Sequence, residues 1–378
     1  ELLQRGDTTG VFQLESSGMK RYLKDLKPTE FDDIVAMCAL YRPGPLSAGL
    51  VDSFIRRKNG QEDVVYDHPT MEPSLSSTYG VLVYQEQFMQ ISKDVCGFSG
   101  GEADTLRKAI GKKKRDIMLK MEKRFIEGAV ENGIPKKLIE DFWSKLLGFA
   151  DYCFNKSHSA CYGLIAYQTA YLKAHYPSAF MAALMTSDYD DIDRLAVEIT
   201  ECKHMGIKVL PPDINESFVE FAVVPKTKAI RFGMSAIKNV GTGAVESIIE
   251  ARSEGPFKDL NDLFSRINTR LVNRRNFESL IKAGALDSFG ERSYLLHNLD
   301  AMLAYASRLN KEKSSGQANL FGSVVDDNHI KPQLTLEDPD IKYTVREQLM
   351  WERELLGLYL SQHPLEAYSL LLSEQTIP

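Results

Sequence analysis

The sequence lacks the features that would direct it to a membrane or out of the cell. It contains no hydrophobic run that approaches the roughly 18 residues of a membrane span. Its first residues do not show the charged stretch followed by an apolar stretch that is typical of a signal peptide. We therefore expect a soluble protein with no membrane partner. The chain begins at Glu1 rather than at Met and ends at Pro378, which favours a piece of a longer protein.

Paired cysteines are also missing. The 5 cysteines include no C-x-x-C pair and lie at Cys38, Cys96, Cys153, Cys161 and Cys202. This scattered pattern predicts reduced, mostly buried thiols and a cytoplasmic setting. Cys153, His158 and Cys161 fit no common zinc spacing, and no fourth ligand is evident.

What the sequence does contain is an ordinary globular balance with an uneven distribution of charge. Its 378 residues, 43% hydrophobic and 26% charged, predict two or three domains. The net charge of -6 conceals one dense basic stretch, "LRKAIGKKKRDIMLKMEKR" (106–124), where nine Lys and Arg face two acidic residues. Such a stretch in an acidic protein indicates one surface that meets a polyanion.

Apolar residues at helical spacing predict a mostly α-helical chain up to about residue 215. A helix over "EFDDIVAMCALYR" (30–42) is expected to end at the prolines of "RPGPL", and a glycine break is expected at Gly100 and Gly101. The apolar helix over "SACYGLIAYQTAYLKAHY" (159–176) is expected to be central and buried on most sides. "EFAVVPKTKAIRFG" (220–233) predicts a short β hairpin, after which come further helices, a linker over 310–342 and a last helix near 345–360.

The basic stretch offers the first candidate site. Arg107 and Lys108 precede three adjacent lysines, Lys112, Lys113 and Lys114. Arginine and lysine make strong charge-assisted contacts with phosphate oxygens, and one arginine can bind two oxygens at once. A solvated helix face is the alternative, although three adjacent lysines cannot all share one face.

A second candidate is the polar cluster "FNKSHSACYG" (154–163), which lies between two apolar helices. Ser157 and Ser159 are the expected N-caps of the helix that follows. The backbone amides of that helix start, with Lys156 beside them, would form an anion site, and a capped loop without a ligand is the alternative. A hydrolytic pair of Ser157 and His158 is disfavoured, because adjacent residues rarely present nucleophile and base to one another.

The acidic segment "DYDDIDR" (188–194) carries Asp188, Asp190, Asp191 and Asp193. Convergent carboxylates of this kind could hold the two metal ions of a nucleotidyl transferase or a hydrolase. A solvated loop, or a helix N-terminus favoured by the dipole, is the preferred interpretation.

The segment "IKNVGTGAVESIIEAR" (237–252) predicts two short helices that meet at a turn formed by Gly241, Thr242 and Gly243. This is the pattern of a helix-hairpin-helix, in which glycines let backbone amides approach a phosphate closely. Contacts of this kind bind DNA without reading its bases. An ordinary corner between two helices would also use glycine.

A family resemblance rests on seven motifs, "VFQLES", "RPGPL", "YQEQ", "LRKAIGKKK", "FNKSHSACY", "YQTAYLKAHYP" and "LPPDIN". Together they closely resemble the bacterial DNA polymerase III alpha subunits, the C-family replicative DNA polymerases, along the whole chain. The resemblance implies a mostly α fold in four parts. These are a fingers domain (1–215), a β hairpin with a helix-hairpin-helix module (216–309), a linker with a clamp-binding peptide (310–345), and a helix (346–378) that leads to an oligonucleotide-binding domain outside the chain.

The same resemblance implies roles for individual residues. The fingers would hold the incoming deoxynucleoside triphosphate (dNTP), and the helix-hairpin-helix would grip duplex DNA through phosphates in a salt-dependent way. The nucleotide contacts implied are Arg107, Lys108, Arg42, Lys156 and His158. The implied DNA contacts are Lys112, Lys113, Lys114, Asn155, Ser157, Gly241, Thr242 and Gly243.

The sequence also departs from the family. The metal-binding aspartates of these polymerases lie in a palm domain with a P-D-I-D-type strand, and no such strand occurs here. We therefore expect that Mg²⁺ acts in a full-length enzyme. In this fragment we expect no cofactor and no catalytic residue, and we expect that the chain alone synthesises no DNA. The expected partners are primer–template DNA, dNTP, the sliding clamp and other replicase subunits. A non-catalytic DNA-binding adaptor that uses only the hairpin and the clamp peptide is the alternative.

One further motif, "SGQANLFGS" (315–323), places an apolar pair in polar surroundings. It resembles the Gln-x-x-Leu-Phe peptide by which these subunits bind the ring-shaped sliding clamp. Gln317 would hydrogen-bond the clamp backbone while Leu320 and Phe321 fill an apolar pocket, each side chain contributing roughly 1.5–3 kcal/mol. Packing of this pair onto its own domain is the other possibility. "DYCFNKSHS" (151–159) also resembles a split-intein splicing junction at Cys153, but an incidental buried thiol is the better interpretation.

Overall fold

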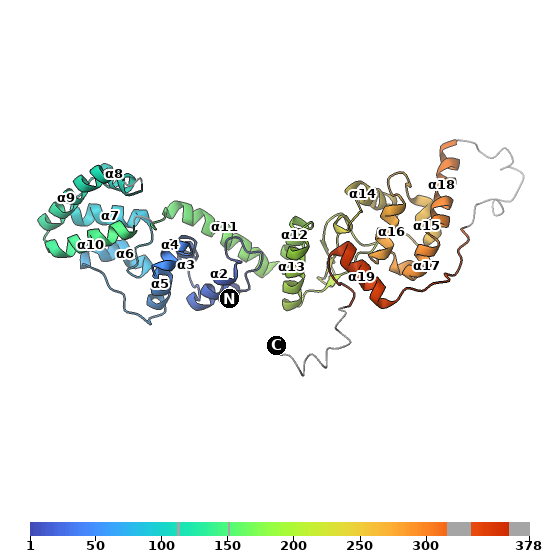
Figure 1. Cartoon of the computed structure of the whole chain (residues 1–378), viewed down its shortest axis with the longest axis horizontal. Coiled ribbons are helices and arrows are strands. Elements are labelled where there is room, and N and C mark those ends of the chain that lie inside the picture. Colours follow the sequence, from blue (N-terminus) through green and yellow to red (C-terminus); the bar gives the residue numbers. More distant parts are fainter. Residues whose placement is uncertain (112–113, 150–151, 316–333, 363–378) are drawn as a thin grey trace, which may run out of the picture. The chain divides into compact units, whose positions relative to one another are not determined.

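The protein is described by a computed structural model that covers residues 1–111, 114–149, 152–315 and 334–362. These residues fall into two compact units, Glu1–His175 and the part that begins at Tyr176. Helices dominate both units, and one small sheet lies in the second (Figure 1). The predicted mostly α fold is confirmed.

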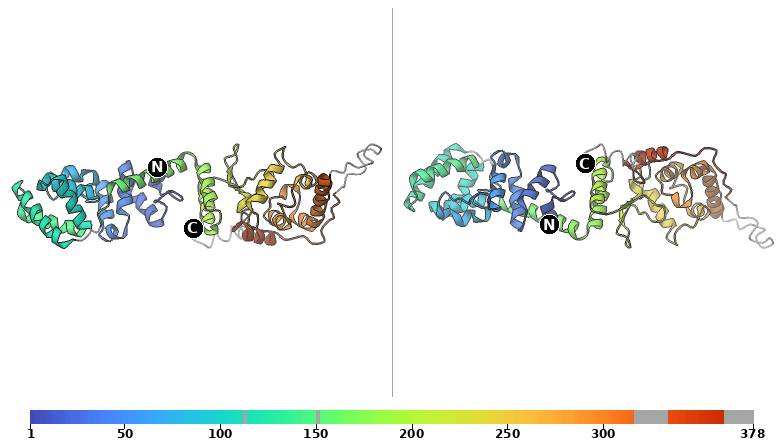
Figure 2. Two further views of the ribbon diagram at one scale, coloured as in Figure 1. Left: turned by 90° about the horizontal axis from the view of Figure 1, so that it is seen from above. Right: turned by 90° about the horizontal axis from the view of Figure 1, so that it is seen from below.

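The first unit contains two groups of helices, each around its own hydrophobic core. The first group is α1 (Leu2–Arg5), α2 (Ser17–Leu26), α3 (Phe31–Leu40), α4 (Pro43–Ser47), α5 (Leu50–Lys58) and α11 (Lys156–His175). The second is α6 (Glu72–Leu75), α7 (Gln85–Cys96), α8 (Gly100–Gly111), α9 (Arg115–Glu131) and α10 (Lys136–Phe149), with short 3₁₀ turns at Pro69–Met71 and Ser76–Thr78. Figure 2 shows α7 to α10 gathered side by side. Phe125 fills the middle of this second group, with its ring 5.1 Å from that of Trp143.

The segments that lead into α7 and α11 are joined, although α7 belongs to the second group and α11 to the first. Tyr84 and Phe154 form a parallel β bridge. The amide of Gln85 donates to the carbonyl of Phe154 at 2.9 Å, and the amide of Phe154 donates to Val83 at 3.1 Å. This bridge fixes the start of α11 beside the start of α7.

Helix α11 differs from its expected burial. It packs on α3 through a face of small residues, and a Cβ at Gly163 would lie 3.1 Å from the Val35 side chain. The opposite face is exposed and uncharged, and it includes Leu164, Ile165, Tyr167, Tyr171 and Leu172. The prediction that this helix is buried on most sides was wrong, because an apolar composition alone does not reveal which face is covered.

Two predicted turns also differ in detail. Helix α3 ends before "RPGPL" as expected, but Pro43 then opens α4, because a proline at the first helical position costs no hydrogen bond. The break before α8 lies at Gly97, which adopts a left-handed conformation (φ 65°), rather than at Gly100 and Gly101, which begin α8. Pro177 opens the helix after α11, so α11 ends where it was predicted to end.

The second unit has one core, to which nearly all of its elements contribute. Its helices are α12 (Pro177–Ser187), α13 (Ile192–His204), α14 (Thr242–Ala251), α15 (Leu260–Arg266), α16 (Arg274–Lys282), α17 (Arg292–His297), α18 (Leu299–Ser315) and α19 (Val345–Leu356). Short 3₁₀ turns cover Met234–Ala236 and Asp287–Phe289. Helices α12 and α13 belong to this core, so the predicted fingers domain (1–215) spans the first unit and the first two helices of the second. That domain boundary stays a prediction.

The sheet has the strand order β1-β3-β2. Strands β2 (Ala222–Val223) and β3 (Ile230–Arg231) form the predicted antiparallel hairpin, in which Val223 pairs with Ile230. Strand β1 (Val209–Leu210) adds a parallel pairing to β3 that the sequence analysis missed. A strand of two residues before two prolines is too short to show an alternating pattern.

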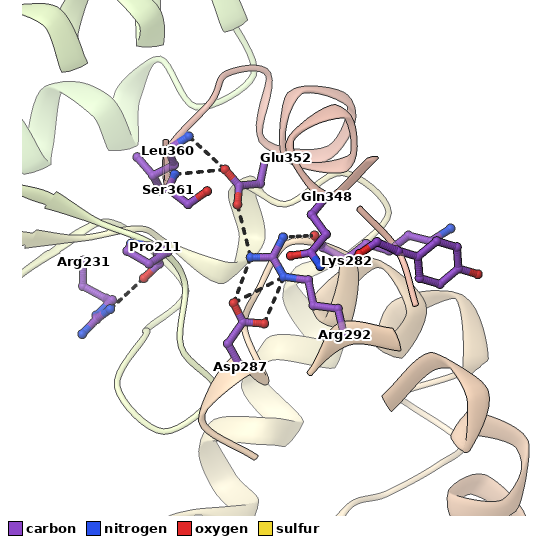
Figure 3. Close-up of polar contacts among 10 residues, drawn as sticks. Pro211, Arg231, Lys282, Asp287, Arg292, Gln348, Glu352, Leu360 and Ser361 are labelled. Carbon is purple, nitrogen blue, oxygen red and sulfur yellow. Dashed lines mark hydrogen bonds and ion pairs between the residues drawn. The ribbon is translucent and has the colours of Figure 1, made fainter. Parts of the chain in front are cut away.

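A polar network centred on the buried Arg292 and Glu352 attaches α19 to this unit (Figure 3). The guanidinium of Arg292 donates to Asp287 at 2.9 Å, to Glu352 at 3.2 Å and to the carbonyl of Lys282 at 3.1 Å. Burial alone would lower the pKa of Arg292, but the hydrogen bond to Asp287 and the charges of Asp287 and Glu352 outweigh it and raise that pKa. Glu352 also accepts the amides of Leu360 and Ser361, so it secures the turn after α19.

Within the part that the structure describes, no helix is long and apolar enough to cross a bilayer. All five cysteines are free thiols. Cys96 and Cys202 are buried, Cys38 and Cys153 are half-buried, and Cys161 is exposed, so the expected burial holds for most of them.

Candidate nucleotide and nucleic-acid interfaces

Arg107 and Lys108 lie on α8, one turn after an acidic residue that neutralises them in part. Asp104 accepts from Arg107 at 2.9 Å and from Lys108 at 2.7 Å. The hydrogen bonds from Lys108 and Arg107 lower the pKa of Asp104, so its carboxylate stays charged. The side chains of Arg107 and Lys108 remain 33% and 61% exposed, so an incoming anion could reach them.

The lysines that follow mark the turn between α8 and α9. Lys112 and Lys113 lie outside the described residues. Lys114 is exposed and directly precedes α9, where its carbonyl accepts the amide of Met118 at 2.9 Å. Lys114 is therefore the N-cap residue of α9.

The start of α11 is capped by a residue other than those predicted. The side-chain oxygen of Asn155 accepts the amide of His158 at 2.9 Å. Ser157 is exposed in the first turn, and Ser159 is buried with its hydroxyl donating to the carbonyl of Val35 at 2.5 Å. The predicted N-caps, Ser157 and Ser159, were wrong because the helix begins at Lys156, before either serine.

A carboxylate already occupies this helix start. Glu86, in the first turn of α7, accepts the backbone amide of Lys156 at 3.0 Å. An anion at a helix N-terminus is stabilised by the helix dipole, and here the protein supplies that anion itself. The backbone amides of α11 are therefore a weaker anion site than the sequence suggested, which leaves the side chain of Lys156 as the local cation. Its ammonium lies 5.5 Å from the ring centre of Tyr84.

His158 is exposed but lies between two aromatic rings. Its ring centre is 5.2 Å from that of Phe154 and 4.3 Å from that of Tyr162. These contacts hold the imidazole on the surface at the start of α11. An exposed ring with fixed neighbours is suited to contact a flat ligand group.

Arg42 contacts the segment that precedes α11 and is half-buried. Its Nε donates to the carbonyl of Ala39 at 2.7 Å, its Nη2 donates to Tyr152 at 2.6 Å, and its guanidinium lies 4.3 Å from the centre of the Phe154 ring. Burial lowers the pKa of Arg42. Burial also raises the pKa of the nearby Cys153 thiol to about 12 although the charge of Arg42 opposes this, so the thiol is protonated at neutral pH. This protonated state fits an incidental buried thiol.

The structure thus brings five of the predicted residues to one place and leaves two apart. The five at the start of α11 are Arg42, Asn155, Lys156, Ser157 and His158. Arg107 and Lys108 lie on α8 in the other helix group, and among the described residues their hydrogen bonds and ion pairs go to Asp104 rather than to α11. Sequence analysis missed Asp104 and Glu86. The spacing of Asp104 three and four residues before the two cations could have revealed it, whereas Glu86 is 70 residues from Lys156 and gives no local signal.

In the second unit, the glycine turn forms the N-terminus of α14. Gly241 precedes the helix with an ordinary φ of -77°, and a Cβ at Gly241 or Gly243 would meet nothing within 4 Å. Gly241, Thr242 and Gly243 are all exposed. Neither glycine is needed for backbone conformation or for internal packing, and the space in front of both is open. The helix expected before this turn is only a 3₁₀ turn, Met234–Ala236, and that part of the prediction was wrong.

Helix α16 holds the loop before this turn. Asn239 adopts a left-handed conformation (φ 71°), and its carbonyl accepts the side-chain amide of Asn276 at 2.8 Å. Arg275 donates to the side-chain oxygen of Asn239 at 2.7 Å. Asn239 and Arg275 were not predicted, since the contact joins two separate helical segments. Arg275 and Lys238 are exposed and place positive charge beside the glycine turn.

The acidic segment 188–194 has local partners. Asp191 caps α13 by accepting the amide of Arg194 at 3.1 Å, and Asp188 accepts the Nε of Arg194 at 3.2 Å. Over residues 1–111, 114–149, 152–315 and 334–362, no group of three or more His, Cys, Asp or Glu could hold a metal ion. The described side chains therefore do not fit the Mg²⁺ that the resemblance implies for a full-length enzyme.

The fold is a helical segment of two compact units that expose candidate phosphate-binding groups. Residues 1–133 match the model of the bacterial DNA polymerase III alpha subunit finger domain, and residues 206–295 match a helix-hairpin-helix motif. The chain is 47% identical over 379 residues to DNA polymerase III subunit alpha of Aquifex aeolicus, covering 100% of this chain and 31% of that protein. It is 45% identical to the proteins of that name from Campylobacter jejuni, over 369 residues, and Escherichia coli, over 376 residues; each match covers 97% of this chain, and 31% and 32% of the relative.

The chain belongs to the family of bacterial DNA polymerase III alpha subunits. It spans about a third of the length of the curated relatives that it matches, 31% for the first two.

Proposed function

We propose that this chain is the part of a replicative DNA-directed DNA polymerase that holds the incoming nucleotide and the duplex product. The observation that carries the proposal is the match of residues 1–133 to the polymerase finger domain and of 206–295 to the helix-hairpin-helix. Phosphoryl transfer to DNA depends mainly on positioning and charge neutralisation of phosphates, and both units expose groups suited to this work. The proposal places the chain with chromosomal DNA in the cytoplasm.

The first unit is assigned the nucleotide. Arg107 presents a partly exposed cation and Lys108 an exposed one, each about one turn from Asp104. Lys156 and His158 present an ammonium and an imidazole at the start of α11. A triphosphate could replace Asp104 as the acceptor for Arg107 and Lys108, because an exposed ion pair competes weakly. Lys112, Lys113 and Lys114, with Asn155 and Ser157, are assigned to the DNA strand that accompanies the nucleotide.

The second unit is assigned the duplex. The open amides at Gly241, Thr242 and Gly243 sit at the positive end of α14, with Lys238 and Arg275 nearby. Helix N-termini bind phosphates through backbone amides and the dipole together. Such contacts carry no sequence information, so this unit is expected to hold any duplex.

A nucleotide-binding experiment tests the assignment of the first unit. Calorimetric titration of dATP into the chain should show binding. The double variant Arg107→Ala/Lys108→Ala should lower the dATP affinity at least about tenfold, because two charge-assisted contacts are lost. The control is Lys123→Ala/Lys136→Ala, which removes two exposed lysines that also pair with helical glutamates. Equal losses of dATP affinity in both double variants would show that the effect comes from net charge alone, and would contradict the assignment.

We also propose that the chain alone does not extend primers, because no described cluster could hold the metal ions of phosphoryl transfer. A purified preparation with Mg²⁺, dNTPs and primed template should give no extension. Steady extension that follows the chain through purification would contradict this proposal.

The peptide Gln317–Phe321 is proposed to bind the sliding clamp, and other replicase subunits are further expected partners. The peptide lies outside the described residues, so its support is the motif "QANLF" and its position after the helix-hairpin-helix. Surface-binding titration against an immobilised clamp should show binding that Leu320→Ala/Phe321→Ala removes while DNA affinity stays unchanged. Clamp binding that survives in the double variant would move this assignment to another segment.

A further inference from the structure

The segment that leads into α11 and carries Lys156 and His158 is held to other parts of the first unit at several points. The β bridge between Tyr84 and Phe154 holds one side of it, through hydrogen bonds of 2.9 and 3.1 Å. Arg42 and Glu86 hold it at two further points. Arg42 is 110 residues distant in sequence from Tyr152, and Glu86 is 70 distant from Lys156, so both anchors come from other helices.

Arg42 directs two of its five N–H donors to backbone carbonyls of the protein itself. Its Nε and Nη2 donate to the carbonyls of Ala39 and Tyr152, and its flat face covers the ring of Phe154 at 4.3 Å. A guanidinium can make these three contacts together because it is planar and carries donors in a rigid fork. A lysine at this position could keep the charge but could not reproduce the fork and the stacking.

The effect of these contacts passes to His158 and Lys156. Phe154 contacts both the guanidinium of Arg42, 4.3 Å from its ring centre, and the imidazole of His158, whose ring centre is 5.2 Å away. The carboxylate of Glu86 in addition fixes the first amide of α11 at Lys156. Loss of either anchor would release the first turn of α11, whereas the rest of the helix stays packed on α3.

We infer that Arg42 and Glu86 are positioning residues of the proposed nucleotide site, and that Arg42 acts by placing His158 through Phe154 rather than by gripping phosphate. This inference rests on the proposed function for its nucleotide readout, but its structural readout does not. It revises the direct nucleotide contact that the family resemblance implied for Arg42.

The first test needs no nucleotide. The imidazole signals of His158 in ¹H–¹³C spectra should carry ring-current shifts from Phe154 and Tyr162. In Arg42→Ala and Arg42→Lys alike, these signals should move toward the values of a free histidine, with assignment by the loss of one signal in His158→Ala. Unmoved signals in both variants would overturn the inference.

The second test measures dATP affinity. Arg42→Ala and Arg42→Lys should both weaken binding by about tenfold or more, because a displaced contact group is nearly as costly as a missing one. In a Lys156→Ala/His158→Ala background, Arg42→Ala should cost little more, because residues that act as a unit are not additive. Affinity retained in Arg42→Lys, with additive losses in the combined variant, would make Arg42 a phosphate contact and overturn its positioning role.

Variants of Glu86 distinguish a positioning role of this residue from an effect of its charge. Glu86→Gln keeps an oxygen that can accept the Lys156 amide, so dATP affinity and the His158 signals should stay close to wild type. Glu86→Ala removes this acceptor and should lower the affinity and move the signals. If Glu86→Gln and Glu86→Ala instead raised the affinity equally, Glu86 would act only through its charge, and its positioning role would be wrong.

Arg252 supplies a matched control in the second unit. It too is half-buried, donates to two backbone carbonyls, those of Ile214 and Ser217, and faces an aromatic ring, that of Phe218. Arg252→Ala should leave dATP affinity and the His158 signals unchanged, and an equal loss there would contradict the inference. The fluorescence of Trp143 confirms that the first unit of each variant is folded. A wild-type chain that fails to bind dATP would refute the nucleotide assignment itself, while the His158 signals would still decide whether Arg42 places this segment.

Discussion

The two units present their candidate binding groups in different ways. In the first unit the groups are side chains that already have partners: Asp104 binds Arg107 and Lys108, and Glu86 holds the amide of Lys156. In the second unit the central groups are backbone amides at Gly241–Gly243, and the space in front of the two glycines is open.

This difference suggests a division of labour. Side chains with internal partners can exchange them for a ligand that is bound and released at each step. Open amides at a helix start need no exchange and suit a surface that slides along phosphates. Binding through open backbone amides depends on a rigid backbone in the second unit. The network around Arg292 and the contacts of Asn239 provide this rigidity.

The largest effect is expected from removing the support of the second unit. In Arg292→Ala, the buried carboxylate of Glu352 loses its charged partner, and the free energy of unfolding should fall by about 3–5 kcal/mol. Urea unfolding, followed through Trp351 in a Trp143→Phe background, measures this unit alone, since the sequence has 2 tryptophans. Arg274→Ala is the control, because Arg274 pairs with Asp300 on the surface. A similar small change in both variants would show that the network does not support the unit.

The next effect concerns the open amides. Gly241→Ala/Gly243→Ala should weaken duplex binding by about tenfold, because two methyl groups then stand between the amides and a phosphate, at a cost comparable to one charged hydrogen bond. Stability should hardly change, since both Cβ positions are empty and Gly241 has an ordinary φ. Fluorescence anisotropy with a labelled duplex measures the affinity. Gly148→Ala, at another open helical glycine, is the control and should bind as wild type does. Undiminished binding by the double variant would place the duplex elsewhere.

The smallest effect tests whether side chains in the first unit exchange partners. Asp104→Asn removes the carboxylate that competes for Arg107 and Lys108, so dATP affinity should rise by about two- to fivefold. Because the two hydrogen bonds lower the pKa of Asp104, the carboxylate competes throughout the neutral range, and the gain should not depend on pH between 6 and 8. Calorimetry at both pH values measures it, with Asp300→Asn as the control. A loss of affinity would mean that Asp104 orients the two cations for the ligand.

The sequence predicted features that depend on neighbours along the chain. Helix α3 follows from an apolar stripe, the β2–β3 hairpin from alternation around a turn, and the glycine turn at Gly241 from two nearby glycines. The family resemblance came from motifs of the same local kind.

What the sequence did not predict depends on contacts between distant segments. The exposed face of α11 cannot be distinguished from its buried face by composition, because the exposed face carries Leu, Ile and Tyr while the charged Lys173 is buried. The contacts of Arg42 with Tyr152 and of Glu86 with Lys156 join separate helices, and no spacing rule reaches so far. Strand β1 is recognisable only by its pairing with β3.

The most direct test of the account is the affinity of the wild-type chain for two duplexes of unrelated sequence, measured by anisotropy across a series of salt concentrations. If the second unit grips phosphates, the two duplexes should bind equally, and the affinity should fall steeply as salt increases. Affinity that depends on sequence, or that stays constant with salt, would contradict the assignment of this unit to the duplex backbone.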